Sequence, residues 1–507
     1  MILKQAWIER DKWNKDYIIP SYDRDRVKAE TAKAPVWLHF GAGNIFRAFM
    51  AAAMDRLLEK GLSDKGIIVC EDFDKELVHL AYEPYDCLSL LVTLKADGSV
   101  EKRVVGSVTE AVVDEERMKE LFSLASVQMV SFTITEKGYS GPLMGKIARL
   151  CLERYRQGAH PIALVSMDNC AHNGDLLKEA VLKHARELLA EGQADTGFID
   201  YLTDESRVSF PWSMIDKITP RPDEAVKKLL EEDDFEDSQL IITNRGSYTA
   251  AFVNAEETEY LIIEDKFPNG RPKLEAAGIL FTDRQTVDRV EKMKVGTCLN
   301  PLHTALAVFG CLLGYRTIHD EMEDELLRKM VYRLGYKEGM PVVVDPGIIK
   351  PEEFLSDVLT KRLPNPFMPD APQRIATDTS QKLPVRFGQT LKAYAESDGL
   401  DINELVVIPL VFAGWIRYLT GVNDKGEVFE LSPDPRLEEL CAHLSSVRPG
   451  EYPADLSVVD PILRDRSIFV VDLFECGLAE KVKAMLKEML AGCGAVRRTL
   501  EKYLCED

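Results

Sequence analysis

The spacing of apolar residues changes once along the chain, near residue 290. Before that point short apolar runs alternate with amphipathic stretches of helical spacing, and after it the strand-like runs nearly vanish. Alternating strands and helices predict a mostly parallel sheet covered by helices. The predicted fold class is therefore α/β, followed by a mainly α-helical part. The predicted strands are Val36–Phe40, Ile67–Cys70, Leu88–Leu94, Val127–Thr135 and Ile162–Met167, with helices over Ala48–Leu58 and Leu176–Leu189.

One segment departs from this rhythm. Leu88–Leu94 and Val100–Val105 are joined by Lys95-Ala96-Asp97-Gly98-Ser99, which predicts an antiparallel hairpin added to the parallel sheet.

The C-terminal part shows helical spacing in four long stretches: Thr304–Leu313, Glu323–Leu334, Leu405–Leu419 and Ala479–Leu490. We therefore expect two domains, residues 1–286 with an N-terminal extension and residues 287–507. The chemistry is expected in the cleft between them, where ligand sites are common.

The charge balance excludes some partners. The chain has 84 acidic and 63 basic residues, a formal charge of −21, which repels nucleic acid and anionic membranes. The longest uncharged apolar run, Leu405–Ile416, has about a dozen residues, whereas a membrane span needs roughly 20. The N-terminus is charged from its fourth residue and shows no secretory signal. We expect a cytoplasmic monomer or homodimer that binds neither nucleic acid nor membrane.

The ten cysteines form no Cys-x-x-Cys pair and no cluster of metal-binding type. A chain of 507 residues can bury a large core without covalent cross-links. Reduced, mostly buried thiols and no metal site are therefore expected.

The strand Val36–Phe40 runs directly into a glycine-containing turn. Gly41 permits a tight turn, and Gly43 lets a phosphate approach backbone N–H groups at a helix start. The third glycine of the Gly-x-Gly-x-x-Gly pattern is absent, because Phe46 occupies its place. The pattern favours a Rossmann-type dinucleotide site, and an ordinary strand–helix turn is the alternative. The residues predicted to contact the cofactor here are Gly41, Gly43, Asn44, Ile45, Phe46 and Arg47.

Two acids follow the next predicted strand, about 30 residues further on, at Glu71 and Asp72. An acid at this place can accept hydrogen bonds from the ribose hydroxyls of NAD and would repel the 2′-phosphate of NADP. NAD is therefore the expected cofactor, and the alternative is a solvated strand end without a ligand.

Several segments taken together resemble the polyol-specific long-chain dehydrogenase (mannitol dehydrogenase) family, and the resemblance covers nearly the whole chain. The shared order of many short segments carries it. These segments are Phe40–Gly43 with Arg47–Phe49, Thr133–Tyr139, Asp168-Asn169 with His172–Gly174, Phe210–Pro220, Ile263–Pro272, Lys294 with Leu299-Asn300 and His303, and Arg374 through Lys382–Pro384. The family architecture, a Rossmann-type N-terminal domain before a mainly helical domain, agrees with the pattern described above.

Oxidation of a secondary alcohol by NAD needs a base for the hydroxyl proton and donors for the developing alkoxide. Asn300 and His303 are three residues apart and share one face of a helix, with Lys294 just upstream. By resemblance, Lys294 is the general base, Asn300 an amide donor to the reacting oxygen and His303 a partner of a substrate hydroxyl. Asn169 would be the second amide donor.

The spacing in this chain departs from the family. Five residues separate Lys294 from Asn300, one more than usual, and we expect a bulge ahead of the helix to absorb the extra residue. Lys292 is the other lysine nearby. The alternative is purely structural, with Asn300 capping the helix before Pro301 and His303 satisfied in the core.

Three further residues are assigned to the substrate by resemblance. Arg374 and Lys382 match two family cations, and a fork-shaped and a point-charge donor together suit a carboxylate or a row of hydroxyls. Asp216 occupies the place of a substrate-site acid, or else forms a surface pair with Lys217. Arg386 is a third cation in the same stretch and is expected to be solvated.

The resemblance implies a metal-independent NAD-dependent oxidoreductase acting on a keto-sugar or sugar acid. The long N-terminal extension and the segment 365–384 resemble hexuronate reductases more than mannitol dehydrogenases, and this likeness implies reduction of fructuronate to mannonate. Fructose–mannitol and tagaturonate chemistry remain open. A protein that kept the fold, senses the nucleotide and lost the reaction is the non-enzyme alternative.

Overall fold

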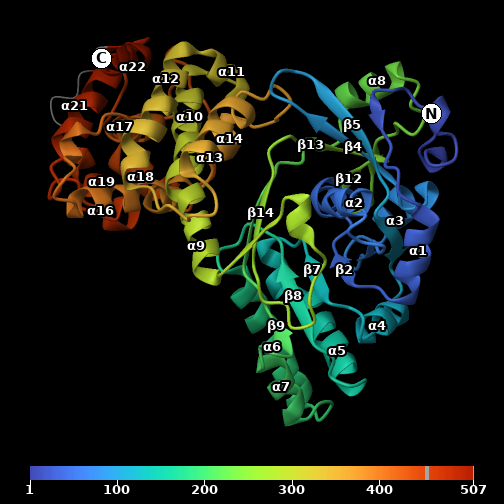
Figure 1. The fold of residues 1–507 in the computed structure, drawn as a ribbon. Coiled ribbons are helices and arrows are strands. Elements are labelled where there is room, and N and C mark those ends of the chain that lie inside the picture. The colour runs from blue at the N-terminus through green and yellow to red at the C-terminus, as the bar shows by residue number, and fades with distance from the viewer. Residues whose placement is uncertain (452–455, 506–507) are drawn as a thin grey trace. The chain divides into compact units, whose positions relative to one another are not determined.

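The computed structural model describes residues 1–451 and 456–505 (Figure 1). The chain forms two compact units, Met1–Asp288 and Arg289–Asp507. The boundary falls within helix α9, Arg284–Met293. The first unit contains the sheets, and the second is built from helices.

A six-stranded parallel sheet forms the centre of the first unit, with strand order β6-β3-β2-β7-β8-β9. The strands are β2 (Trp37–Phe40), β3 (Ile67–Cys70), β6 (Val108–Val112), β7 (Met129–Phe132), β8 (Ile162–Ser166) and β9 (Val208–Ser209). The order turns back at β2 and β7, which is where ligands bind in sheets of this kind. The predicted Rossmann-type α/β fold is confirmed.

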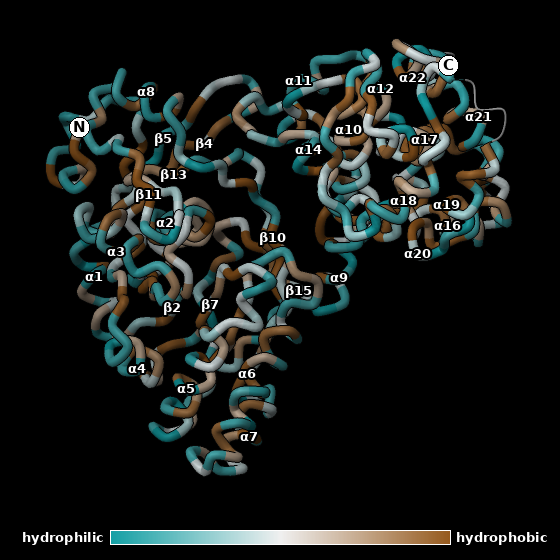
Figure 2. Tube along the Cα trace, turned by 180° about the vertical axis from the view of Figure 1, so that it is seen from behind, coloured by the Kyte–Doolittle hydropathy of each residue, from teal (hydrophilic) through white to brown (hydrophobic). Residues whose placement is uncertain are grey.

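Successive residues of each central strand pack into opposite layers, as the period of two requires. Trp37 and Val69 belong to one apolar core, whereas Leu38 and Phe40 belong to the other. The second core is covered by α4 (Glu115–Ser123), α5 (Pro142–Arg156), α6 (Asn173–Ala190) and α7 (Thr196–Thr203). Hydrophilic and hydrophobic residues alternate along such outer helices, as α5 and α6 show in Figure 2.

The predicted hairpin exists, but its place in the fold was wrong. β4 (Ser89–Leu94) and β5 (Val100–Val105) pair antiparallel in a separate four-stranded sheet with β1 (Tyr17–Ile18) and β13 (Phe252–Glu256). The sheet to which a hairpin belongs is decided by the strands that pair with it, and here these strands, β1 and β13, lie far from the hairpin in sequence. Two smaller sheets contain β10 (Ser213–Asp216), β14 (Tyr260–Glu264) and β15 (Leu280–Thr282), and the hairpin β11 (Ile241–Ile242) with β12 (Tyr248–Thr249).

The helix predicted over Ala48–Leu58 is present, but it begins earlier and its first part is not α-helical. Helical structure begins at Asn44, is π-helical over Phe46–Ala51, and continues as α2, Ala52–Glu59. The other helices of this unit are α1 (Arg24–Lys33), α3 (Glu76–Ala81) and α8 (Glu224–Glu232).

The second unit is organised around two buried helices, α10 (Asn300–Leu313) and α17 (Val407–Tyr418). They pack closely, since a Cβ on Gly414 would lie 2.7 Å from Phe309. Among its described residues the only β pairing is the isolated bridge between Val422 and Val428. The remaining helices are α11 (Ile318–Glu323), α12 (Glu325–Arg333), α13 (Pro351–Asp357), α14 (Pro372–Ile375), α15 (Thr379–Leu383), α16 (Gln389–Glu396), α18 (Leu437–His443), α19 (Asp460–Leu463), α20 (Arg466–Phe469), α21 (Ala479–Met489) and α22 (Ala495–Cys505).

One helical stretch of the described chain, Arg284–Leu313, is long and apolar enough to pass a length-and-composition test for a membrane span. Buried core helices pass the same test, and 72% of its most apolar window is buried within the fold.

All ten cysteines are free thiols. Four are buried, four are half-buried and two, Cys493 and Cys505, are exposed, so the expectation of mostly buried thiols was too strong.

Candidate active site

The glycine turn after β2 has the geometry that its sequence predicts. Gly41 adopts φ +113°, and a Cβ there would lie 2.7 Å from the Thr133 hydroxyl, so a side chain is excluded. The Gly41 N–H donates to the Cys70 carbonyl, which ties the ends of β2 and β3 together. Apart from Gly43 and its chain neighbours, no atom of the described residues lies within 4 Å of the Cβ position of Gly43, so the space over the helix start is open. A phosphate could approach the backbone here.

Phe46, in the place of the missing third glycine, points into the protein. Its buried ring stacks on His39 at 4.2 Å and 11°. His39 is buried beneath the turn and contacts the Ser131 and Thr133 hydroxyls, and burial lowers its pKa to about 3. The helix is π-helical at this place, with a wider turn that accommodates the ring.

Arg47 and Asn44 brace the turn from the helix side. The buried Arg47 guanidinium donates to the Ala250 carbonyl, the Thr249 hydroxyl and the Asn44 side-chain oxygen. The Asn44 amide in turn donates to the Tyr248 carbonyl at 3.1 Å. Arg47 therefore holds the turn against strand β12 and lies under the surface that a cofactor would use.

The two acids after β3 have different surroundings. Glu71 is buried, and its carboxylate accepts from the backbone N–H groups of Ala42, Phe73 and Asp74. Asp72 is half-buried and forms an ion pair with Lys146 at 2.6 Å. Glu71 thus joins the glycine turn to the acid loop, and the more exposed acid is Asp72.

A network of polar groups lies at the carboxyl end of β8, beside the exposed Asn169. The buried Asp168 carboxylate accepts from the Tyr139 hydroxyl at 2.5 Å and from the Ser166 hydroxyl at 2.6 Å. The Cys170 N–H donates to its other oxygen. Burial and the neighbouring Asp168 raise the pKa of Tyr139. This network fixes the loop that carries Asn169.

Asp216 ends β10, opposite Tyr260 of β14, and is buried. Its neighbour Lys217 pairs with Glu259 at 2.9 Å.

In the second unit, Lys294 starts a π-helical segment, Lys294–Cys298, that leads into α10. A π-turn contains one residue more than an α-turn, so this segment is the predicted bulge and takes up the extra residue before Asn300. Lys294 is buried, with 9% of its surface exposed. The Leu299 N–H donates to the Lys294 carbonyl and closes the segment.

His303 lies one turn after Asn300 and faces a buried acid. Its Nε2 atom is 3.4 Å from Asp370 Oδ2, within ion-pair range, though no hydrogen bond of good geometry forms. Arg374 forms an ion pair with the other oxygen of Asp370. Burial disfavours the Asp370 carboxylate, but contacts with His303 and Arg374 outweigh burial and lower its pKa. One carboxylate therefore bridges two predicted site residues.

The predicted cation pair proves to be a group of three. Lys382 donates to the Ile375 carbonyl, and burial together with the neighbouring Arg386 lowers its pKa to about 8. Arg386 donates to the Thr304 hydroxyl at 2.5 Å and to the Asn300 carbonyl at 3.5 Å. The expectation of a solvated Arg386 was wrong, because its guanidinium packs against α10. This burial lowers the pKa of Arg386 to about 10. Arg374 is the most exposed of the three.

Sequence reasoning missed two contacts of the sites, that of Asp370 with Arg374 and that of Tyr139 with Asp168. Asp370 lies four residues before Arg374, in the segment that leads into α14, and this spacing is the signal that could have found it. The Tyr139–Asp168 pair joins residues 29 positions apart, and nothing local predicts that contact.

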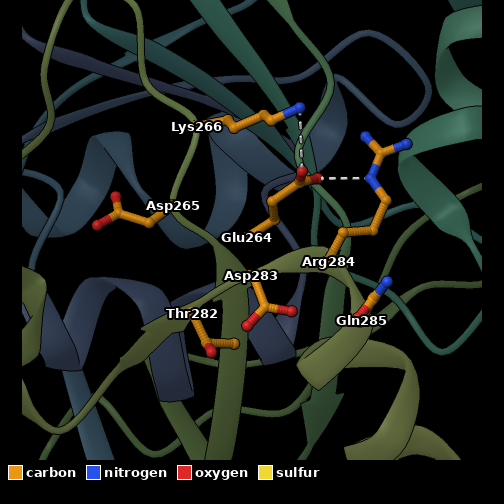
Figure 3. Close-up of a pocket in the computed structure, with 7 residues that line it drawn as sticks. All are labelled: Glu264, Asp265, Lys266, Thr282, Asp283, Arg284 and Gln285. Atoms are coloured by element: carbon orange, nitrogen blue, oxygen red, sulfur yellow. Dashed lines mark hydrogen bonds and ion pairs between the residues drawn. The ribbon is translucent and has the colours of Figure 1, made fainter.

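A pocket of about 680 Å³ lies in the first unit beside the start of α9 (Figure 3). Lys266 and Arg284 approach the buried Glu264 carboxylate from two sides, at 3.5 and 3.0 Å. Arg284 also lies over the Trp212 ring, at 4.8 Å. No predicted site residue lines this pocket, and its ion pairs hold the start of the helix that leads to Lys294.

A Rossmann-type unit followed by a helical unit with a buried lysine and a cation group defines a two-domain dehydrogenase. The model of the mannitol dehydrogenase Rossmann domain matches residues 36–276, and that of the mannitol dehydrogenase C-terminal domain matches residues 286–490. The chain belongs to the mannitol dehydrogenase family of oxidoreductases, as the resemblance predicted.

Individual relatives agree with this assignment. A D-mannonate oxidoreductase of Thermotoga maritima is 49% identical over 528 aligned positions, covering 98% of this chain and 97% of the relative. A mannitol 2-dehydrogenase of Neosartorya fischeri is 28% identical and covers 96% and 95%.

Two solved structures share the fold, both at 24% identity. A substrate-free D-sorbitol dehydrogenase has a TM-score of 0.76 and covers 97% of this chain and 99% of its own. The Pseudomonas fluorescens mannitol 2-dehydrogenase, in a ternary complex with NAD and D-mannitol, has a TM-score of 0.69 and covers 100% of both chains.

Proposed function

We propose that the protein is an NAD-dependent oxidoreductase that interconverts D-fructuronate and D-mannonate. The observation that carries this proposal is the group of three cations, Arg374, Lys382 and Arg386, near His303. In a chain of net negative charge, such a group would bind the carboxylate of a sugar acid. The full-length similarity to a D-mannonate oxidoreductase supports the same substrate.

The residues of the first unit fit a dinucleotide. Gly41 and Gly43 with Asn44 and Ile45 would hold the pyrophosphate at the helix start, since the space over Gly43 is open. Asp72 would accept from the ribose, with Glu71 fixing the acid loop, while Phe46 and Arg47 shape the turn from inside. Bound NADH supplies the hydride, and NAD accepts it in the reverse direction.

The second unit would carry the proton chemistry. Lys294 would give a proton to the carbonyl oxygen of the keto acid during reduction and take it back during oxidation. Asn300 would donate its amide to the same oxygen, and His303 would bind a neighbouring hydroxyl. The donor role of Asn169 and the substrate role of Asp216 in the first unit remain predictions from the family resemblance.

Asp370 is proposed as a positioning residue for this site. It contacts His303 and Arg374 at once, so it fixes a hydroxyl-binding and a carboxylate-binding group relative to each other. A buried carboxylate between two cationic groups also neutralises part of their mutual repulsion.

Two related substrates are the alternatives. Fructose–mannitol chemistry is favoured by the mannitol 2-dehydrogenases among the relatives, and tagaturonate differs from fructuronate only in stereochemistry. A cytoplasmic location and a monomeric or homodimeric state belong to the same proposal and rest on composition alone.

The test is a steady-state assay of reduced-nicotinamide absorbance with NADH or NADPH and a panel of fructuronate, tagaturonate and fructose. Oxidation of NADH by fructuronate at the highest kcat/KM is the expected result. Preference for fructose would overturn carboxylate recognition. Binding of NADH without turnover on the whole panel would favour the non-enzyme alternative.

A further inference from the structure

An exposed aromatic residue directly follows the proposed ribose acid. Phe73 comes next after Asp72 and is 70% exposed, in a protein that buries most of its phenylalanines. Its backbone N–H donates to the buried Glu71 carboxylate, so the loop that carries it is fixed. An exposed ring on a fixed loop is accessible to a ligand, and aromatic rings are common platforms for stacking a nucleobase.

A second residue, distant in sequence, lies over the same ring. The Arg245 guanidinium is 4.7 Å from the centroid of Phe73. It comes from the turn of the β11–β12 hairpin, which is not part of the six-stranded Rossmann sheet. Arg245 is itself exposed, so the pair presents a planar cation and an aromatic ring on the surface.

The hairpin turn is fastened to the acid loop by two carboxylates. The buried Asp74 accepts from the Thr243 hydroxyl at 2.7 Å and from the Ser247 hydroxyl at 2.5 Å. Glu76 accepts from the backbone N–H and side-chain amide of Asn244. Arg245 is therefore flanked on both sides by residues bound to the segment that contains Phe73.

The other end of the hairpin is fastened to the glycine turn. The Tyr248 carbonyl accepts from Asn44, and the Thr249 hydroxyl accepts from Arg47. The hairpin thus runs from the proposed pyrophosphate site to the proposed ribose acid, along one side of the path that a dinucleotide would follow.

We propose that Phe73 and Arg245 bind the adenosine end of the dinucleotide, with Phe73 stacking on the base. This inference rests on the proposed NAD site and adds to it a recognition element supplied by the β11–β12 hairpin. The ligand class is an adenine nucleotide, and the nicotinamide half makes no use of the pair.

The test compares NADH with reduced nicotinamide mononucleotide, which lacks the adenosine half, by fluorescence titration of the full-length protein. Phe73→Ala should weaken NADH binding roughly 10-fold, the size expected for loss of one base–aromatic stack, and leave the mononucleotide within about 2-fold. Arg245→Gln should weaken NADH binding by a smaller factor. Competition by 5′-AMP should weaken in parallel.

Ile242→Ala is the matched control, because Ile242 is a 60% exposed apolar residue of the same hairpin. It should change neither affinity. Unchanged NADH affinity in both Phe73→Ala and Arg245→Gln would overturn the inference and leave the NAD site standing. Absence of NADH and 5′-AMP binding in the unaltered protein would instead overturn the proposed function, and the inference with it.

Discussion

Lys294 is the residue on which the proposed chemistry depends most. It is buried at the start of the π-helical segment, six residues before Asn300. Buried lysines are uncommon, because a charged ammonium loses its hydration, and those that exist are held in ion pairs or serve in catalysis.

Lys294→Ala should lower kcat at least about 100-fold, since a general acid–base contributes roughly 10²–10⁴ in rate. The NADH affinity should stay within about 2-fold, because the proposed cofactor residues belong to the first unit. Stopped-flow turnover and NADH titration measure the two effects. Lys292→Ala is the control, and full activity of Lys294→Ala with loss in Lys292→Ala would move the base to Lys292.

Asp370→Asn removes the charge between His303 and Arg374 while keeping the shape. We expect kcat/KM for the keto acid to fall about 10- to 100-fold, because small displacements of positioned groups have effects of this size. Most of the loss should be a higher KM, because Arg374 is no longer held by the Asp370 carboxylate. Asp370→Glu should recover part of it. Asp357→Asn, which breaks the surface pair with Lys361, should have no effect. Equal losses in both Asn variants would assign Asp370 to stability alone.

Lys382 titrates near physiological pH. Its pKa of about 8 means that the ammonium is present below pH 8 and is lost as the pH rises through that value. The KM for a ketohexuronate should therefore be flat from pH 6.5 to 7.5 and rise several-fold by pH 9, whereas the KM for fructose should not follow this curve. Lys382→Arg keeps its charge and should give a flat profile. A KM curve identical for both sugars would remove Lys382 from carboxylate binding.

At the scale of elements, helix α11 contains a carboxylic acid side chain that is buried in the packed core of the second unit. Glu321 is fully buried, and neither of its carboxyl oxygens has a hydrogen-bond partner among the described residues. It fits only because residue 310 of α10 is glycine, where a Cβ would lie 2.0 Å from its oxygen. Burial raises its pKa well above the ordinary value, with Asp320 and Asp324 adding to the effect.

The folded protein therefore holds the Glu321 proton at pH values where the unfolded chain has released it, so this residue lowers stability as the pH rises above about 4.5. Glu321→Gln should raise the free energy of unfolding by at least about 1 kcal/mol at pH 8, with a smaller gain at pH 5. Urea denaturation at the two pH values measures this. The exposed Glu323→Gln is the control, and an equal gain at both pH values would contradict the argument.

The π-helical segments show how elements depart from sequence patterns. Around Phe46 and again at Lys294, a residue that does not match a familiar spacing coincides with a π-turn. An α-helix keeps its register on both sides of such a turn, so one extra residue can be absorbed without rotating the flanking helices out of their packing.

At the scale of the whole molecule, a buried histidine of the first unit should lower stability in acid. His39 has a folded pKa of about 3, below the roughly 6.5 of an unfolded histidine. It contributes stability that is complete above pH 6.5 and is lost as the pH falls toward 3, about 2 kcal/mol by pH 5. The combined fluorescence of the five tryptophans can follow unfolding, and one of them, Trp37, donates to Ser131, which also contacts His39. The His39→Gln variant should have a lower free energy of unfolding than the unaltered protein at pH 7. Its free energy of unfolding should, however, fall less between pH 7 and pH 5, and an equal fall in both proteins would contradict this argument.

The pattern of apolar residues carried most of the fold prediction. The strand Ile67–Cys70 and the hairpin strand Val100–Val105 have the predicted bounds, because local turn and β-propensity signals mark their ends. The sheet that receives the hairpin could not be predicted, since β1 and β13 are paired with it across long stretches of chain. Arg386 was misjudged for a related reason, because burial is a property of the surroundings and not of the residue.

The sequence by itself determined the Rossmann-type architecture, the helical second part, the glycine turn and the family, all of which depend on short-range spacing or on the order of local motifs. Only the tertiary structure decided which charges meet: Asp370 with His303, Asp72 with Lys146, and Arg245 over Phe73. These contacts join residues that are 67 to 172 positions apart, or that depend on a hairpin being fastened at both ends. Periodicity contains no information about such pairs, because chain folding, not chain order, brings them within a few ångströms.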